Sequence, residues 1–163
     1  MSFEIERKFL VCQDDWRDIV RGCSRIRQAY LTANDKASVR VRIKDEEAAT
    51  LTIKSRGAEL RRLELEYAVP VPEAEVMLSL RHGTIVEKLR YDIPWCDLVW
   101  EVDVFSGENI GLVIAEIELV HETQPFVLPP WIGEEITGQA RYYNGALAQQ
   151  PFGSWALDNY QAG

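Results

Sequence analysis

In the stretch FEIERKF, residues 3–9, charged side chains at every second position alternate with a mainly apolar set. Side chains of a β-strand point alternately to its two faces, so Glu4, Glu6 and Lys8 would share one face. The apolar residues of the stretch would form the opposite face. The stretch therefore predicts a strand with one charged and one apolar side.

The same period of two recurs along the chain and defines eight expected strands. They span residues 3–11, 26–32, 37–44, 49–56, 60–69, 83–92, 97–106 and 112–120. Three segments break the alternation and are expected to be helical, namely residues 14–21, 72–80 and 131–148. Gly57, Gly83 and residues 106–109 supply turn residues between strands. This pattern predicts a mainly β (α+β) single domain over residues 1–163, an antiparallel barrel or sandwich with a few peripheral helices.

Like charges gather in pairs on the polar faces of these strands. The basic pairs are Arg40 with Arg42 and Lys88 with Arg90, and the acidic pairs are Glu64 with Glu66, Glu101 with Asp103 and Glu116 with Glu118. Neighbouring like charges repel, so their recurrence favours a site where a divalent metal neutralises the acidic group and a polyphosphate the basic group. An amphipathic sheet with its charged face in water is the alternative, because alternation does not say which face lies inside a barrel.

The overall composition limits the partners of the chain. Its 163 residues are 47% hydrophobic, enough to bury one core. Lys and Arg total 18 against 26 Asp and Glu, and the formal net charge of -8 would repel nucleic acid and anionic membranes. No apolar stretch is long enough to span a bilayer and no signal-peptide pattern is present, so a cytoplasmic location is expected. Cys12, Cys23 and Cys96 lack the spacing of zinc or redox motifs and are expected to be buried thiols in a reducing compartment.

Seven blocks of the sequence resemble the CYTH superfamily, also called the triphosphate tunnel metalloenzymes. The first, Glu4-Ile5-Glu6-Arg7-Lys8, is similar to the ExExK signature of that family. The others are VRVR at 39–42, LTIK at 51–54, LELEY at 63–67, EKLRY at 87–91, WEVD at 100–103 and AEIE at 115–118. The resemblance, which is to the short bacterial inorganic triphosphatase type, implies an eight-stranded antiparallel closed β-barrel whose charged residues point into a tunnel.

The resemblance also implies metal-dependent hydrolysis of a small-molecule triphosphate, with inorganic tripolyphosphate split into pyrophosphate and phosphate. The substrate clamp would consist of Lys8, Arg40, Arg42, Lys54, Lys88 and Arg90, and the metal ligands of Glu4, Glu6, Glu101, Asp103, Glu116 and Glu118. Hard carboxylate oxygens favour Mg²⁺ or Mn²⁺, and Glu64 and Glu66 are expected to orient tunnel cations. The alternatives are a thiamine or nucleoside triphosphatase, an adenylate cyclase of the class IV type, and a non-catalytic polyphosphate-binding module. Outward apolar faces are compatible with a homodimer.

Lys8 and Tyr30 are the expected catalytic residues. An ammonium beside Tyr30 would favour its phenolate, which would serve as general base. Metal-bound hydroxide is the competing source of the nucleophile, and ordinary packing is the competing role for the tyrosine. His82 and His121 lie near strand ends without a Ser or Cys motif, and a structural or surface role is expected for both. Arg141, in the tail RYYNG, is a further candidate for a phosphate contact.

Overall fold

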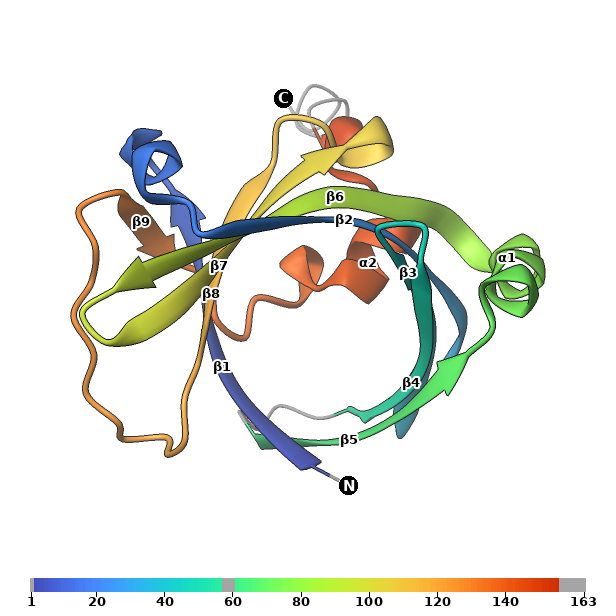
Figure 1. Cartoon of the computed structure of the whole chain (residues 1–163). Helices are drawn as coiled ribbons and strands as arrows, with labels where there is room; N and C mark the ends of the chain where they lie inside the picture. Colours follow the sequence, from blue (N-terminus) through green and yellow to red (C-terminus); the bar gives the residue numbers. More distant parts are fainter. Residues whose placement is uncertain (1, 57–60, 156–163) are drawn as a thin grey trace, which may run out of the picture.

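The computed structural model describes residues 2–56 and 61–155, without the side chains of residues 2–4 and 61 (Figure 1). In this part of the chain the strands are β1 (Ser2–Val11), β2 (Gly22–Ala33), β3 (Ala37–Lys44), β4 (Ala48–Ser55), β5 (Arg61–Val69), β6 (His82–Trp95), β7 (Leu98–Ser106), β8 (Val113–Glu118) and β9 (Ile132–Glu135). The α-helices there include α1 (Val71–Ser79) and α2 (Asn144–Gln149), residues 152–155 are also helical, and the 3-10 helices are η1 (Asp15–Ile19), η2 (Gly107–Asn109) and η3 (Ala140–Tyr142). The alternation thus located β1 to β8, and β9 is additional.

Strands β1 to β8 close into an antiparallel barrel, as expected. Their order is β5-β4-β3-β2-β6-β7-β8-β1, and a pairing between β1 and β5 completes the ring. β1 closes the ring because different residues of this strand pair with different neighbouring strands. Residues 2–5 pair with β5, residues 6–10 pair with β8, and the end of the strand pairs with β9. Figure 1 views the resulting ring along its axis, with α1 outside it.

The apolar faces of the barrel strands lie outside, and α1 and η1 cover parts of them. α1 packs on β3 and β4, where Val41 and Leu78 are buried in one cluster. In a second cluster, Trp16 of η1 packs near Val102 of β7, and both are fully buried. Leu147 of α2 belongs to a third cluster with Val86 and Ile114, which share their strand faces with Lys88 and Glu116, so α2 packs on the inner side of the barrel (Figure 1). With these faces occupied, the charged faces are left to line the interior.

Only one of the expected helices has its predicted extent. Residues 72–80 correspond to α1, whereas residues 14–21 contain only the short η1. The prediction of a helix over residues 131–148 is wrong, because this segment contains β9, η3 and, from Asn144 onward, α2. The available edge of β1 explains the difference: the Ile136 amide donates to the Lys8 carbonyl over 2.8 Å, and the Arg7 side chain bonds to Glu135. No helix within residues 2–56 and 61–155 has the length and apolar character required to cross a membrane.

The expected turn residues have different outcomes. Gly57 lies outside the described residues, and residues 107–109 form η2 between β7 and β8. Gly83 is the second residue of β6 and has a φ of 73°, a conformation that favours glycine. A Cβ atom at this position would lie only 2.4 Å from the backbone oxygen of Ala148. Gly83 therefore permits the close packing of α2 on β6.

The cysteines are exposed, which corrects the prediction of buried thiols. Cys96 and Asp97 form the two-residue loop between β6 and β7, with positive φ values of 46° and 65°. Two left-handed residues in succession are typical of a type I′ hairpin turn, a surface feature. Cys12 directly follows β1, and Cys23 is the second residue of β2. All three thiols thus lie at strand ends or in a turn, where alternation does not impose burial.

Candidate active site

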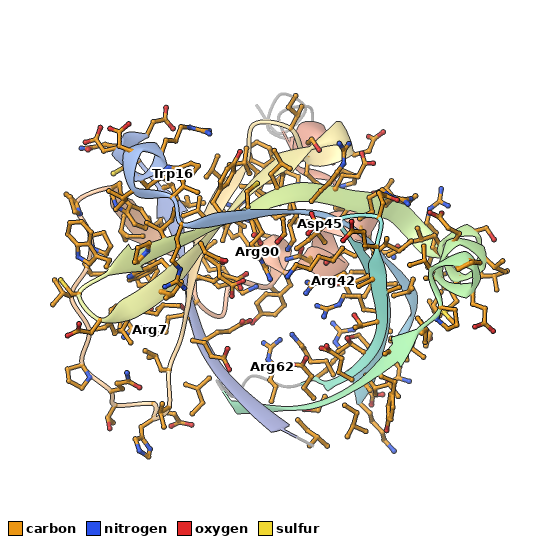
Figure 2. The ribbon with its side chains drawn as sticks, in the orientation of Figure 1. Arg7, Trp16, Arg42, Asp45, Arg62 and Arg90 are labelled. Atoms are coloured by element: carbon orange, nitrogen blue, oxygen red, sulfur yellow. The ribbon has the colours of Figure 1, made fainter. Side chains whose placement is uncertain are left out.

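The interior of the barrel holds a cavity of about 680 Å³. Among the described residues its lining includes eight basic side chains, Lys8, Arg40, Arg42, Lys54, Arg56, Arg62, Lys88 and Arg90, and six acidic ones, Glu6, Glu64, Glu66, Glu101, Glu116 and Glu118. Figure 2 shows Arg42, Arg62 and Arg90 pointing into the ring. The chain as a whole carries a formal charge of -8, so the cavity gathers positive charge against the overall balance. This interior suits a small ligand with several negative charges.

All six residues expected to clamp phosphate line this cavity. Arg40 of β3 donates from Nη2 to Thr52 Oγ1 on β4, 3.3 Å away. Its Nε is buried and has no hydrogen-bond partner in the described part of the chain. An unsatisfied buried donor is costly, so Arg40 Nε is available to donate a hydrogen bond to an anion. Arg42, two residues further along β3, donates from Nε to Gln28 Oε1 over 2.8 Å.

Asp103 is buried behind the basic residues, with both carboxylate oxygens bound to cations. Arg90 donates two hydrogen bonds of 2.8 and 2.9 Å, and Lys88 Nζ lies 2.8 Å away. Burial opposes ionisation, but Lys88 and Arg90 hold the pKa of Asp103 well below its usual range. Burial, together with repulsion from Arg90 and Arg42, lowers the pKa of Lys88 to about 7 even though Asp103 raises it. Asp103 and other carboxylates raise the pKa of Arg90 against the effect of burial, so Lys88 is the cation of this group that releases its proton more easily.

Lys8 lies between two carboxylates inside the same cavity. Its Nζ is 3.2 Å from Glu116 and 3.7 Å from Glu6. Burial alone would lower the pKa of Lys8, but Glu116 and Glu6 raise it above its ordinary value, with a smaller contribution from the Tyr30 hydroxyl. In return, Lys8 helps to hold the pKa of Glu116 at about 2 despite burial. Tyr30 lines the same cavity, and its hydroxyl accepts a 3.4 Å hydrogen bond from Gln28 Nε2.

Four of the expected metal ligands face each other across neighbouring strands. Glu6 of β1 is opposite Glu118 of β8, and Glu101 of β7 is opposite Glu116 of β8. Like charges in such positions destabilise a sheet unless a cation lies between them. Burial and neighbouring carboxylates raise the pKa of Glu101. The side chain of Glu4 lies outside those described. Among the described side chains no three of the His, Cys, Asp and Glu type form a group that could hold a metal by itself.

Several side chains that the sequence analysis did not assign to the site also contribute to it. The Arg62 guanidinium lies 4.7 Å from the centre of the Tyr143 ring, and Lys8 Nζ lies 5.6 Å from it. Gln28 is fully buried, and Asn144 accepts a hydrogen bond from the clamp lysine of β6. The period of two places Arg62 on the face shared by residues 64 and 66, so that signal was present in the sequence. Gln28 shares the face of Tyr30 by the same period, and Tyr143 and Asn144 belong to the tail RYYNG, in which only Arg141 was a candidate.

The remaining candidates lie at the edge of the cavity or outside its lining. His82 is exposed and borders the cavity. Arg141 is exposed, its Nη2 donates to the Tyr142 hydroxyl over 3.1 Å, and its guanidinium packs 4.7 Å from the ring centre of Trp155. These contacts hold Arg141 beside aromatic rings, and the structure gives no support to the expected phosphate contact.

The fold and the site define a class of protein, the closed antiparallel β-barrels with a charged interior. The chain belongs to the CYTH domain family, whose model matches residues 2–149. It is 44% identical over 153 residues to an inorganic triphosphatase of Acetivibrio thermocellus, covering 93% of this chain and 97% of the relative. It is 40% identical over 149 residues to an inorganic triphosphatase of Nitrosomonas europaea, covering 89% and 96%. A crystal structure of an inorganic triphosphatase is similar with a TM-score of 0.65 at 37% identity, covering 89% of this chain and 97% of that one.

Proposed function

We propose that this protein is a metal-dependent triphosphatase that hydrolyses inorganic tripolyphosphate to pyrophosphate and phosphate. The observation that carries the proposal is the convergence of the six expected clamp residues on one cavity that also contains Glu6, Glu101, Glu116 and Glu118. The two inorganic triphosphatases described above, similar over nearly their whole lengths, support the choice of the inorganic substrate.

The basic residues of the cavity would hold the substrate. Tripolyphosphate carries roughly four negative charges near neutral pH, and charge-assisted hydrogen bonds to phosphate are the strongest that side chains make. Arg40 and Arg42 suit the non-bridging oxygens because a guanidinium presents a planar set of donors. Lys88 and Lys54 contribute compact charges from other strands of the barrel. Binding would relieve the mutual repulsion that these cations exert in the free protein.

The acidic residues fit a hard divalent cation, Mg²⁺ or Mn²⁺. Magnesium at phosphate sites is commonly held by one or two carboxylates together with substrate oxygens. The opposed pairs Glu6 with Glu118 and Glu101 with Glu116 offer such carboxylates, and this mode does not require a preformed group of three ligands. When bound, the metal would neutralise charge that develops on the phosphoryl oxygens. We assign Asp103 to orienting Lys88 and Arg90, because its oxygens already bind these cations.

The chain also supplies groups for proton transfer. Glu116 and Glu6 keep Lys8 protonated inside the barrel. In this proposal the Tyr30 oxygen, in the same cavity as the charged ammonium, acts as general base toward the attacking water. Gln28 Nε2 donates to the same hydroxyl oxygen over 3.4 Å and helps to fix its position. Transfer of a phosphoryl group depends mostly on positioning and charge stabilisation, and the rigid barrel provides both.

A substrate panel tests the proposal. Purified protein is incubated with tripolyphosphate, thiamine triphosphate or ATP, each with Mg²⁺, Mn²⁺ or excess chelator, and phosphate, pyrophosphate and cyclic AMP are quantified. We expect phosphate and pyrophosphate in equal amounts from tripolyphosphate, with no turnover in chelator. A higher kcat/KM for thiamine triphosphate or ATP would identify that organic triphosphate as the preferred substrate in place of tripolyphosphate. Production of cyclic AMP from ATP would indicate a cyclase. Tight binding of tripolyphosphate without turnover would indicate a binding module.

A further inference from the structure

A chain of hydrogen bonds crosses the cavity wall and connects two residues of the expected clamp. Arg42 Nε donates to Gln28 Oε1 over 2.8 Å, and Gln28 Nε2 donates to Asn144 Oδ1 over 3.1 Å. Lys88 Nζ donates to the same Asn144 oxygen over 2.9 Å. The chain therefore runs from β3 through β2 and the beginning of α2 to β6.

The acceptors in this chain are neutral, and that suits a site for an anion. Arg42 and Lys88 line the cavity together with Arg90 and repel one another, so these cations are held close together at a cost. A carboxylate at either amide position would relieve the repulsion, but it would also cancel positive charge and repel a phosphate. An amide oxygen instead satisfies a donor and fixes its direction while the positive charge stays available to the ligand.

We propose that Gln28 and Asn144 are positioning residues for the triphosphate, whose side-chain amides fix the directions of Arg42 and Lys88 toward bound phosphate. The inference rests on the proposed function and adds to it a role for the C-terminal segment. Gln28 is completely buried and uses its oxygen and its nitrogen in the chain. Its nitrogen also reaches the hydroxyl of Tyr30, so the same amide connects the clamp with the expected general base.

The segment around Asn144 is held in place by contacts of its own. A Cβ atom on Gly145 would lie 3.6 Å from the Tyr30 ring, so the backbone passes close to that tyrosine. Leu147 and Ala148 are fully buried, and the Ala148 carbonyl accepts a 3.2 Å bond from Thr84 Oγ1 on β6. This anchoring brings the asparagine into the cavity wall reproducibly. A segment that only sealed the barrel would need its shape there and would not need an amide.

The test compares substitutions that keep side-chain size and remove the amide. Asn144→Leu and Gln28→Met are each expected to raise the KM for tripolyphosphate about tenfold, with a smaller change in kcat. Gln150→Leu is the matched control, because Gln150 lies just after α2 outside the cavity lining and is expected to leave KM unchanged. Calorimetric titration of tripolyphosphate in excess chelator should show the same weakening of affinity, and melting temperatures confirm that each variant is folded.

A double variant separates one connected chain from two independent packing effects. If the two amides act together, Asn144→Leu combined with Gln28→Met should raise KM little more than the more affected single variant. Multiplied effects would overturn the proposal, as would unchanged KM and affinity in Asn144→Leu. If Gln28→Met does not fold, the comparison of Asn144→Leu with Gln150→Leu still decides, because Asn144 is only half-buried. Absence of turnover in the wild type would refute the proposed function, whereas normal turnover in both single variants would refute this inference alone.

Discussion

Replacement of Arg42 by methionine should separate substrate binding from stability of the barrel. Burial and then repulsion from Arg40 and Arg90 lower the pKa of Arg42, so its charge is unfavourable in the free protein. Methionine keeps much of the side-chain length and removes the charge. We therefore expect the free energy of unfolding to change little, because relief of this repulsion offsets the lost bond to buried Gln28, whereas affinity for the substrate falls.

The size of the effect on binding follows from the bonds that are lost. A hydrogen bond between a charged donor and phosphate contributes about 1.5 to 3 kcal/mol, which corresponds to a rise in KM of about 10- to 150-fold. The lower end of that range is the better expectation for Arg42→Met. Removing this arginine relieves repulsion that lowers the pKa of Lys88, so Lys88 becomes more fully protonated at neutral pH and partly compensates.

The assay is release of phosphate from tripolyphosphate at saturating metal, with urea unfolding in chelator as the stability measurement. Arg25→Met is the matched control, because Arg25 lies on neighbouring β2, is exposed and is not part of the cavity lining. A KM for Arg42→Met within about threefold of the wild-type value, combined with a large loss of kcat, would refute the clamp role and place the arginine in the chemical step.

Four further perturbations test other parts of the site. Tyr30→Phe should lower kcat about 10²- to 10⁴-fold with little change in KM. If the pH profile of kcat is identical to that of the wild type, Tyr30 has only a packing role. Glu116→Gln should raise the Mg²⁺ concentration needed for half-maximal activity, because an amide is a poorer ligand for a hard cation; an unchanged metal titration would argue against this ligand. The pKa of Asp103 is lowered in the folded state. At pH values above its ordinary pKa of 3.8 the carboxylate therefore stabilises the fold, and this stability is lost as the pH falls below 3.8. Urea titrations in chelator at pH 6, 4 and 3 should therefore show falling stability, with a shallower fall in Asp103→Asn, and equal slopes would contradict the assignment. Gly83→Ala should lower the melting temperature and raise KM together, because a Cβ atom 2.4 Å from the Ala148 oxygen displaces α2; an unchanged KM in a destabilised variant would separate α2 from substrate binding.

The fold was largely predictable from the sequence because closed sheets impose a period of two on every strand. Charged faces at residues 4–8, 40–42 and 116–118 identified their strands without any partner information. The direction of those faces came from the family resemblance, since alternation is the same for a barrel turned either way. β9 escaped detection because it has only four residues, IGEE, and its pairing depends on an edge of β1 that closure of the barrel leaves available.

The site was predictable where its residues follow the strand period and not where they come from elsewhere. Lys8, Arg40 and Glu116 share the alternation of their strands and line the cavity together. Asn144 lies 116 positions from Gln28, in a segment without alternation, so its contact could not be inferred from spacing. The roles of the metal ligands, the cytoplasmic location and the homodimer remain predictions.

Because β1 pairs with β5, β8 and β9 over different residues, the protein can become active only late in folding. Lys8 pairs with Glu116, and its amide bonds to Thr137 Oγ1, 129 positions further along the chain. Contacts between such distant positions form slowly, because a long loop must close before they contribute any stability. During synthesis residues 6–11 of the first strand must wait until β8 and β9 have left the ribosome before they are paired. Lys8 and Glu6 can face their partners only after that step, so the onset of activity in a refolding experiment should report ring closure rather than the earlier formation of the β2–β3–β4 meander.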